Sequence, residues 1–329
     1  MSAAAVNQPG QGRLYFICVP RSGSTSLLKC LSFFEDSDVW FEPFVICRVV
    51  RRQFARNTGR ALPTEWDEEH AVDFDRAAAF MQASNKLPTS EGKKFAFSEV
   101  KQAIDNSTRQ IVIVKDMATS FSNRLEYLPS PAAGFKFVFM IRDPYHAISS
   151  YRKASVAAFR KLGHYHALTK KYHGFTMGGN DSDYDVSVDD PYYGSQRTCY
   201  EKLREVWLHV CKELDPSPLV IDTEDFLADP KGFLQKICQV GGLPYDDGLL
   251  HWDASPDVTM TWKEPGGIPG MMTNSLSDFH LTAATSSHIH PRKVRKPRPD
   301  RASLTEDVLR VVDRGMPFYE ELYKHRFIP

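Results

Sequence analysis

The chain has 329 residues, with 41 Lys and Arg against 41 Asp and Glu, so its formal net charge is zero. Its 42% hydrophobic and 25% charged residues are typical of a soluble globular protein and exclude a disordered, collagenous or coiled-coil chain. The balanced charge also argues against a nucleic-acid partner, because nucleic-acid-binding domains carry a broad basic excess.

The cysteines and the N-terminal stretch indicate a cytoplasmic protein. The six cysteines are scattered without a C-x-x-C pair, so we expect buried free thiols in a reducing compartment. Residues 1–12 are polar, lack the charged and apolar regions of a signal peptide, and are expected to form a flexible tail. No apolar run approaches the roughly 20 residues that span a bilayer, so we expect no membrane partner.

Four short apolar runs predict buried strands. They are Leu14–Val19, Ile111–Lys115, Phe135–Ile141 and Leu219–Asp222. Their nearly continuous Val, Ile and Phe content, without strict alternation, is typical of parallel strands that are covered on both faces.

Helical patterns lie between and after these runs. The predicted helices are Ser24–Phe34, Gln196–Leu214, a stretch from Pro230 to Gly241, and a C-terminal helix opened by a capping box at Ser303–Glu306. Strands that alternate with helices predict a three-layer α/β fold, in which helices flank an open parallel sheet. We expect a single domain over residues 13–329. Long loops are expected at 163–195 and 253–301, which are poor in helix and strand signals.

The first predicted strand leads directly into a loop suited to binding a phosphate group. The loop is Pro20–Ser26, and a helix begins within it. A helix start directs backbone N–H groups and a partial positive charge at one point. Gly23 lets the backbone approach a ligand closely, and Arg21 adds a bidentate cation. Further donors are the hydroxyl groups of Ser22, Ser24, Thr25 and Ser26.

The main alternative to this interpretation is the phosphate loop of kinases and other NTPases. That loop has the pattern G-x-x-x-x-G-K-[ST], in which the Lys contacts the terminal phosphates and the Ser or Thr binds magnesium. Residues 20–26 contain one glycine and no Lys-Ser or Lys-Thr pair. The loop therefore suits a phosphate but lacks the magnesium–triphosphate residues. A small-molecule kinase with a degenerate loop stays an alternative.

A second motif follows the third predicted strand. Asp143 is a good N-cap and Pro144 a good first helical residue, so a helix is predicted to begin here. Ser150 then lies about two turns into that helix, roughly 10 Å along its axis from the cap. Arg142 at the strand end and Ser150 on the helix can thus reach one phosphate group from different sides. Ligands of open α/β sheets bind beyond the carboxyl ends of the strands, where both motifs lie.

Together the two motifs resemble those of sulfotransferases that use 3′-phosphoadenosine 5′-phosphosulfate (PAPS). Residues 20–25 match that family's P-[KR]-S-G-[ST]-[ST] loop at every position, and Arg142 and Ser150 have the family's spacing of eight residues. The resemblance implies a P-loop sulfotransferase fold of the small-molecule branch over most of residues 13–329. It also implies that the loop holds the 5′-phosphosulfate, that Arg142 and Ser150 hold the 3′-phosphate, and that 3′,5′-adenosine diphosphate (PAP) is the product.

The family's late R-K-G segment, which closes over the 3′-phosphate, has a partial counterpart. Arg292 and Lys293 are followed by Val294 and not by glycine. The Pro-rich basic run 291–298 is interpreted either as a mobile lid that orders on the cofactor or as a solvated basic loop or nuclear-type signal.

Sulfuryl transfer needs a base and fixed cations. The acceptor hydroxyl loses a proton as it attacks, and negative charge on the bridging oxygen must be stabilised. The resemblance places Arg21 beside the leaving phosphate, and Lys115 at a strand end is the second candidate cation. Glu42 is the favoured general base, because it lies in an E-P segment like that of carbohydrate and trehalose-type sulfotransferases. Asp116 is the second candidate base, with a salt bridge to Lys115 as its alternative role.

No metal is expected, because fixed cations can stabilise the charge and because the histidines at 164, 166 and 173 lack partners at ligand spacing. Aromatic residues of the 163–195 stretch are candidates for lining an acceptor pocket. The predicted partner is a small hydroxylated acceptor, whose identity the sequence leaves open together with the oligomeric state. A nucleotide-binding protein of the same fold without turnover is a third, non-enzymatic alternative.

Overall fold

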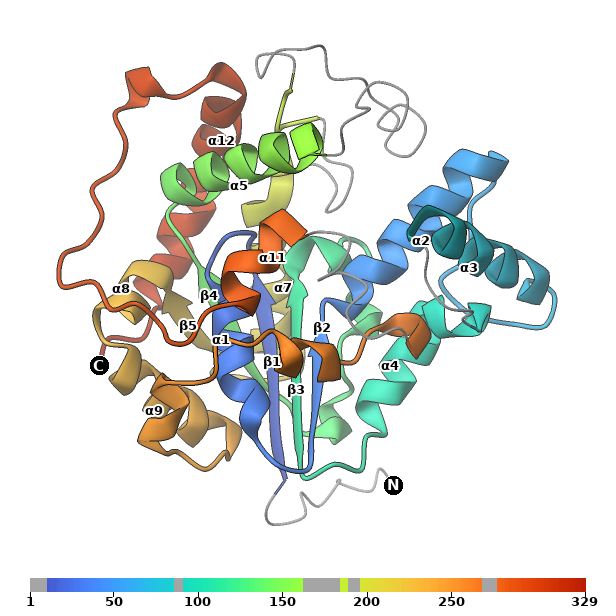
Figure 1. Cartoon of the computed structure of the whole chain (residues 1–329), viewed down its shortest axis with the longest axis horizontal. Coiled ribbons are helices and arrows are strands. Elements are labelled where there is room, and N and C mark those ends of the chain that lie inside the picture. Colours follow the sequence, from blue (N-terminus) through green and yellow to red (C-terminus); the bar gives the residue numbers. More distant parts are fainter. Residues whose placement is uncertain (1–10, 86–90, 162–183, 189–195, 268–276) are drawn as a thin grey trace.

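The computed structural model describes residues 11–85, 91–161, 184–188, 196–267 and 277–329. At the centre of these residues lies a five-stranded sheet in the order β2-β3-β1-β4-β5, and all neighbouring strands are parallel (Figure 1). The strands are β1 (Gly12–Cys18), β2 (Ser37–Phe41), β3 (Ile111–Met117), β4 (Lys136–Ile141) and β5 (Leu219–Asp222). The four predicted strands are confirmed, as is the α/β fold with a parallel sheet flanked by helices.

The edge strand β2 is absent from the sequence prediction. Its sequence, SDVWF, mixes polar and apolar residues, whereas the other strands are mostly apolar. One side of β2 pairs with β3. On its other side the Lys263 N–H donates to the Val39 carbonyl at 2.7 Å, and the Phe41 N–H donates to the Lys263 carbonyl at 3.1 Å. A distant segment therefore covers this edge, and no local pattern in the sequence reports such pairing.

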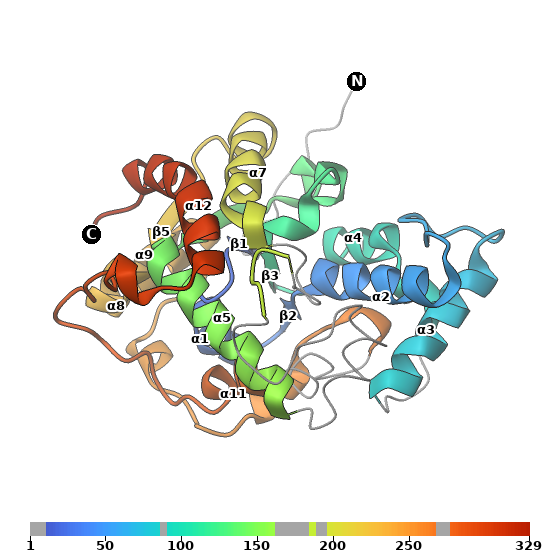
Figure 2. The same ribbon diagram turned by 90° about the horizontal axis from the view of Figure 1, so that it is seen from above.

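Helices cover both faces of the sheet. On one face lie α1 (Ser24–Cys30) and α11 (Ser277–Ala284), and on the other lie α7 (Cys199–Glu213) and α12 (Glu306–Lys324) (Figures 1 and 2). Helix α5 (Pro144–Lys161) crosses beyond the carboxyl ends of the strands. The buried apolar side chains form one cluster that runs from β1 to α12.

Two further groups of helices lie beside the two edges of the sheet. Beside β2, three helices form a lobe (Figure 1): α2 (Pro43–Thr58), α3 (Ala71–Asn85) and α4 (Phe97–Asp105). After β5 the chain forms α8 (Thr223–Ala228) and α9 (Pro230–Gly241). The predicted start of α9 is confirmed, since the Asp229 carboxylate accepts a hydrogen bond from the Gly232 N–H at 3.0 Å. Among the described residues, no helix is long and apolar enough to cross a membrane.

The structure corrects two of the predictions about helices and loops. Helix α12 begins after Thr305, while the Ser303 hydroxyl donates to the Asp300 carbonyl at 2.6 Å, so the predicted capping box does not form. The stretch 253–301 is not a continuous loop, because it contains α11, which packs against α1 and α5. A helix of 8 residues depends on such tertiary contacts. Residues 163–183 and 189–195 of the other predicted loop, and residues 1–10 of the predicted tail, lie outside the described residues.

Candidate active site

Each strand of the sheet brings a charged residue to the same edge. Because all the strands are parallel, their carboxyl ends meet on one side of the molecule. The residues that lie at or just after these ends are Arg21 (β1), Glu42 (β2), Lys115 (β3), Arg142 (β4) and Glu224 (β5). Four of these five are predicted from the sequence as site residues; Glu224 is not.

The loop after β1 is sharply curled. Arg21 and Gly23 both have left-handed backbone conformations, with φ of 63° and 77°. The left-handed region is costly for a residue with a side chain, about 1–3 kcal/mol, and such strain is concentrated at functional sites. The Thr223 hydroxyl holds the loop in place, since it lies 2.9 Å from both the Ser22 and the Ile141 carbonyl oxygens.

Arg21 connects the two predicted phosphate-binding motifs. Its Nε donates to the Ser150 Oγ at 3.2 Å, and its carbonyl oxygen accepts a hydrogen bond from the Arg142 guanidinium at 2.7 Å. Asp143 accepts the Tyr145 N–H at 2.9 Å, so α5 begins as predicted and presents Ser150 on the loop side. The structure therefore brings Arg21, Arg142 and Ser150 together, although 129 residues separate the first from the last.

A cavity of about 580 Å³ opens beside this cluster. The phosphate loop forms one wall with Arg21, Gly23 and the hydroxyl-bearing residues 24–26. The opposite wall comes from α11 and the segment 285–292, which includes Arg292. Ser22 does not line the cavity, and its buried hydroxyl has no hydrogen-bond partner. The buried Nε of Arg142 also has none. An unpartnered buried donor on a cavity-lining arginine fits an anionic ligand.

Lys29 of α1 anchors the α11 wall. Its ammonium group is fully buried and donates to the carbonyl oxygens of Asp253, Ala284 and Ser286, at 3.1, 2.6 and 2.7 Å. Burial lowers the pKa of Lys29, and the nearby Asp253 opposes that change. The wall opposite the phosphate loop is therefore attached to the helix that starts from that loop.

Glu224 lies between two arginines of the cavity. Its buried carboxylate is 3.6 Å from the Arg142 guanidinium and 3.3 Å from that of Arg292. Burial lowers the pKa of Arg142, and the negative charge of Glu224 opposes that change. Sequence reasoning missed Glu224 because an acidic residue after a strand has no distinctive local pattern.

The basic run after Arg292 pairs with acidic residues. Arg295 pairs with Asp222 at 3.0 Å, and Arg298 pairs with Asp143 at 2.6 Å. Both side chains are also partly exposed, so the interpretation as a solvated basic loop stays open beside these ion pairs. Lys293 is exposed and does not line the cavity, so the structure does not bring it to the predicted site. The idea of a lid that orders on the cofactor stays a prediction.

Lys115 and Glu42 form a fully buried ion pair. The Lys115 ammonium donates to the Glu42 Oε1, and it lies 5.0 Å from the centre of the Phe41 ring. Glu42 has a left-handed backbone with φ of 47°, and its Oε2 is buried without a hydrogen-bond partner. Neither residue lines the cavity directly. A strained backbone and an unpartnered buried oxygen are features found at functional sites, and the role of Glu42 as general base stays a prediction.

Asp116 occupies a structural position beneath the site. Its Oδ2 accepts the Phe44 N–H at 2.7 Å, and its Oδ1 accepts the Met117 N–H at 2.6 Å and the Ser120 hydroxyl at 2.8 Å. Burial raises the pKa of Asp116 to about 7, while these donors oppose the change. Its contacts fix the start of α2 against the end of β3, and its predicted role as second candidate base stays a prediction.

His280 is a site residue that the sequence analysis missed. It lies on α11, is buried, lines the cavity, and contacts the Phe41 ring edge-on with centroids 5.1 Å apart. Burial lowers the pKa of His280 well below its usual range, and the positive charges of Lys115 and Arg21 lower it further. The imidazole is therefore neutral near pH 7. No motif surrounds His280, and only the packing of α11 brings it to the site.

The structure also bears on the predictions about metals and thiols. Within the described residues, no group of three or more His, Cys, Asp and Glu side chains could hold a metal ion. The histidines at 164, 166 and 173 and most of the proposed acceptor aromatics lie outside these residues. All six cysteines are described and are free thiols, five of them buried, as predicted.

Comparisons with known proteins agree with this architecture. A family model described as "Sulfotransferase family" matches residues 14–247. No curated protein matches the chain. Among solved structures, the chain is similar to the sulfotransferase domain from the curacin biosynthetic pathway, with 14% identity and a TM-score of 0.40 over 97% of this chain and 99% of that one. The chain is also similar to the sulfotransferase domain of a Synechococcus olefin synthase, with 15% identity and a TM-score of 0.38 over 94% of this chain and 96% of that one. A third similar structure is a mouse sulfotransferase complexed with PAP, with 11% identity and a TM-score of 0.37 over 98% of this chain and 86% of that one. Because the family model matches more than half of this chain, the chain belongs to the sulfotransferase family, an enzyme family that uses PAPS.

Proposed function

We propose that this sulfotransferase moves a sulfuryl group from PAPS to a hydroxyl group of a small-molecule acceptor, by in-line transfer without a metal. The observation that carries the proposal is the contact of Arg21 with both Arg142 and Ser150, which joins the two predicted phosphate-binding motifs. The kinase alternative has no support, because the loop lacks the Lys-Ser or Lys-Thr pair and the chain belongs to the sulfotransferase family.

The residues around the cavity fit a ligand with phosphate groups at both ends. At the 5′ side, Arg21, Gly23, Ser24, Thr25 and Ser26 supply donors and a close backbone approach. Arg142 and Arg292, which line the cavity, would hold the 3′-phosphate together with Ser150, which contacts Arg21 but is not among the lining residues. When bound, PAPS supplies the activated sulfuryl group, and the chain supplies position and charge.

The buried residues beyond the cavity suit proton removal and charge stabilisation. The acceptor hydroxyl must lose its proton as its oxygen bonds to sulfur. The Glu42 Oε2 can accept that proton, because this buried oxygen has no hydrogen-bond partner in the structure. The charge that develops on the departing phosphate oxygen is stabilised by the fixed cations Arg21 and Lys115. His280 is the second candidate for the base, because it is a neutral imidazole that lines the cavity.

Ligand-dependent thermal stability tests the cofactor assignment. We expect PAP to raise the melting temperature more than adenosine 5′-monophosphate, since a ligand at 100 times its Kd adds about 2.7 kcal/mol. Arg142→Gln is expected to abolish most of the difference in melting temperature between the protein with PAP and the protein with adenosine 5′-monophosphate. Arg109→Gln, in an exposed ion pair with Asp36, is the matched control and should keep it. Stronger stabilisation by ATP with magnesium, or no effect of the 3′-phosphate, would contradict the proposal.

A pair of variants tests the base assignment. Glu42→Gln is expected to lower kcat for sulfuryl transfer by about 10²–10⁴-fold, the range of general base catalysis, and to leave PAP binding intact. His280→Asn is expected to lower kcat less. The reverse order of the two effects would assign the base to His280 instead of Glu42.

A further inference from the structure

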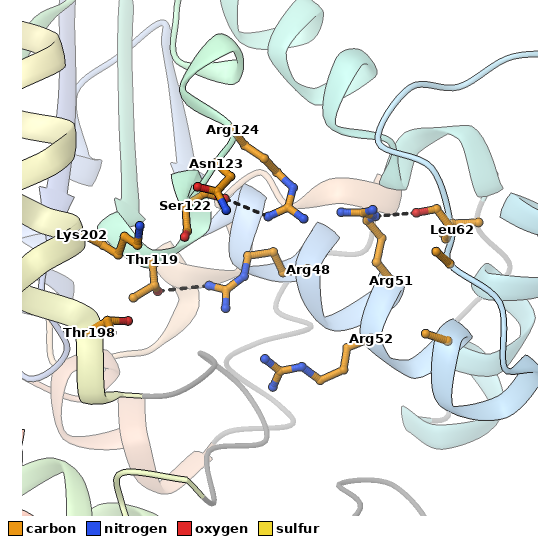
Figure 3. Close-up of a pocket in the computed structure, with 12 residues that line it drawn as sticks. Arg48, Arg51, Arg52, Leu62, Thr119, Ser122, Asn123, Arg124, Thr198 and Lys202 are labelled. Atoms are coloured by element: carbon orange, nitrogen blue, oxygen red, sulfur yellow. Dashed lines mark hydrogen bonds between the residues drawn. The ribbon is translucent and has the colours of Figure 1, made fainter.

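A second cavity, of about 500 Å³, is lined by positively charged residues (Figure 3). Helix α2 supplies Arg48, Arg51 and Arg52, the segment after β3 supplies Arg124, and α7 supplies Lys202. The uncharged lining includes Thr119, Ser122, Asn123 and Thr198. No Asp or Glu is among the described residues that line it. We call this cavity the basic pocket.

Two arginines of the basic pocket are held close together without a carboxylate between them. The guanidinium groups of Arg51 and Arg124 lie 5.8 and 5.5 Å from the centre of the same Phe97 ring, and Figure 3 shows them pointing toward each other. Arg51 donates to the Leu62 carbonyl at 2.7 Å, and Arg124 donates to the Ser122 carbonyl at 3.2 Å. Burial lowers the pKa of Arg51, and the charge of Arg124 lowers it further. Because like charges repel, this arrangement costs stability until an anion enters between them.

Two of the segments that line the basic pocket also carry the residues of the buried ion pair. Glu42 immediately precedes α2, and Thr119 follows Lys115 by four residues. The Arg48 guanidinium donates to the Thr119 hydroxyl at 3.1 Å, which joins the two segments inside the pocket. Arg48 lies six residues after Glu42, which is about 9 Å along a helix. An anion in the pocket is thus within the length of a small molecule from the proposed base.

We propose that the basic pocket binds an anionic group of the acceptor, a phosphate, sulfate or carboxylate, at the other end of the molecule from the hydroxyl group that is sulfated. This inference rests on the proposed function and narrows its acceptor to hydroxylated anions. Arg51 and Arg124 bind the anion, and Lys202 of α7 contributes positive charge. A cavity of this size, about 500 Å³, takes a small anionic molecule rather than a long polyanion.

Binding of inorganic sulfate to the protein saturated with PAP tests the pocket itself. PAP occupies the phosphate-binding residues of the cavity beside the phosphate loop, which we call the cofactor cavity, but leaves the position of the sulfuryl group free. Titration calorimetry therefore assigns sulfate to the basic pocket only where binding depends on Arg51 and Arg124. We expect wild-type protein to bind sulfate, and Arg51→Gln and Arg124→Gln each to weaken this binding about tenfold or more, the effect of one charge-assisted hydrogen bond. Arg109→Gln, at the opposite end of β3, is the control and should bind like the wild type. No sulfate binding by the PAP-loaded wild type, or binding by both pocket variants as tight as that of the wild type, would overturn the inference.

The acceptor is tested with radiolabelled PAPS and a library of hydroxylated metabolites divided into anionic, neutral and cationic fractions. We expect labelled product from the anionic fraction, and a higher KM with similar PAP affinity in Arg51→Gln and Arg124→Gln. Product from the neutral or cationic fraction that is unaffected by the variants would overturn the assignment of an anionic acceptor. Failure of PAP to bind would instead contradict the proposed function, so the two failures are distinguishable. Circular dichroism of each variant verifies that it is folded.

Discussion

Arginines line both the cofactor cavity and the basic pocket, but the groups that surround their charges differ. In the cofactor cavity, Arg142 and Arg292 share the buried carboxylate of Glu224. In the basic pocket, Arg51 and Arg124 face each other over Phe97, and the described lining holds no acidic residue. Arginines that share a carboxylate are held in place before a ligand arrives, whereas Arg51 and Arg124 repel each other until an anion binds between them. On the proposed roles, the first site is preorganised for its ligand, and the second gives up stability for binding.

The largest expected effect comes from the buried ion pair of Lys115 and Glu42, which lines neither region. Lys115→Met leaves the buried Glu42 carboxylate unpaired, which costs about 3–5 kcal/mol of unfolding free energy. It should also lower kcat by about 10²–10³-fold, because a fixed cation is lost. The double variant Lys115→Met/Glu42→Gln should recover most of the stability but none of the activity. Urea unfolding and a transfer assay measure the two effects, and recovery of activity by the double variant would contradict the catalytic role of the pair.

The next effect is a pH dependence at Asp116, which contacts the start of α2 and a residue that lines the cofactor cavity. Its carboxylate accepts the Phe44 N–H at the start of α2 and the N–H of the cavity residue Met117. Its pKa is raised to about 7 in the folded state, above the usual 3.8, so the folded protein binds more protons between these values. Stability should therefore fall as pH rises from about 4 to about 7. Over two pH units the fall is at most about 2.7 kcal/mol.

The variant Asp116→Asn isolates this contribution. It should remove the part of the pH dependence that arises from residue 116, although it also lowers stability overall by losing the acceptor for the Phe44 N–H. Unfolding free energies at pH 5 and pH 7 provide the measurement. Parallel curves for the wild type and the variant would show that Asp116 is ionised throughout this range.

A smaller effect is expected at Arg142, on ligand binding alone. Arg142→Gln should weaken PAP binding by about 1.5–3 kcal/mol, the contribution of a hydrogen bond to a charged group. Arg124→Gln should leave PAP binding unchanged, because Arg124 lines only the basic pocket. Calorimetric titration of both variants with PAP distinguishes the two regions, and equal losses would show that they form one continuous anion site.

The smallest expected effect is a gain in stability, whereas most substitutions lower the stability of a protein. Arg124→Gln relieves the repulsion on Arg51 and should raise the stability of the ligand-free protein by about 0.5 kcal/mol at low salt. High salt screens the repulsion and should remove the gain. Thermal unfolding at two ionic strengths measures it, and a loss of stability at low salt would show that the contact of Arg124 with Phe97 outweighs the repulsion.

The site residues that the sequence predicts are those with local patterns. Residues 20–26 form one turn between a strand and a helix, and Arg142 and Ser150 stand at a strand end and two turns into the helix after it. Such features depend on neighbours in the sequence. His280, Glu224 and the arginines of the basic pocket have no such pattern, because distant segments bring them to their sites. The strand β2 was missed for the same physical reason, since its pairing with β3 and Lys263 is entirely tertiary.

The buried ammonium of Lys29 has a consequence for how a nucleotide enters and leaves. Its three carbonyl partners hold the α11 wall of the cofactor cavity to α1, and their burial shields these bonds from salt. The continuation of that wall, residues 292–298, is held by partly exposed arginines whose ion pairs salt does screen. Exchange of the cofactor should therefore proceed by release of the 292–298 segment, while α11 stays in place. Ionic strength should then change the rate of cofactor exchange through the ion pairs of residues 292–298, and not through the contacts of Lys29.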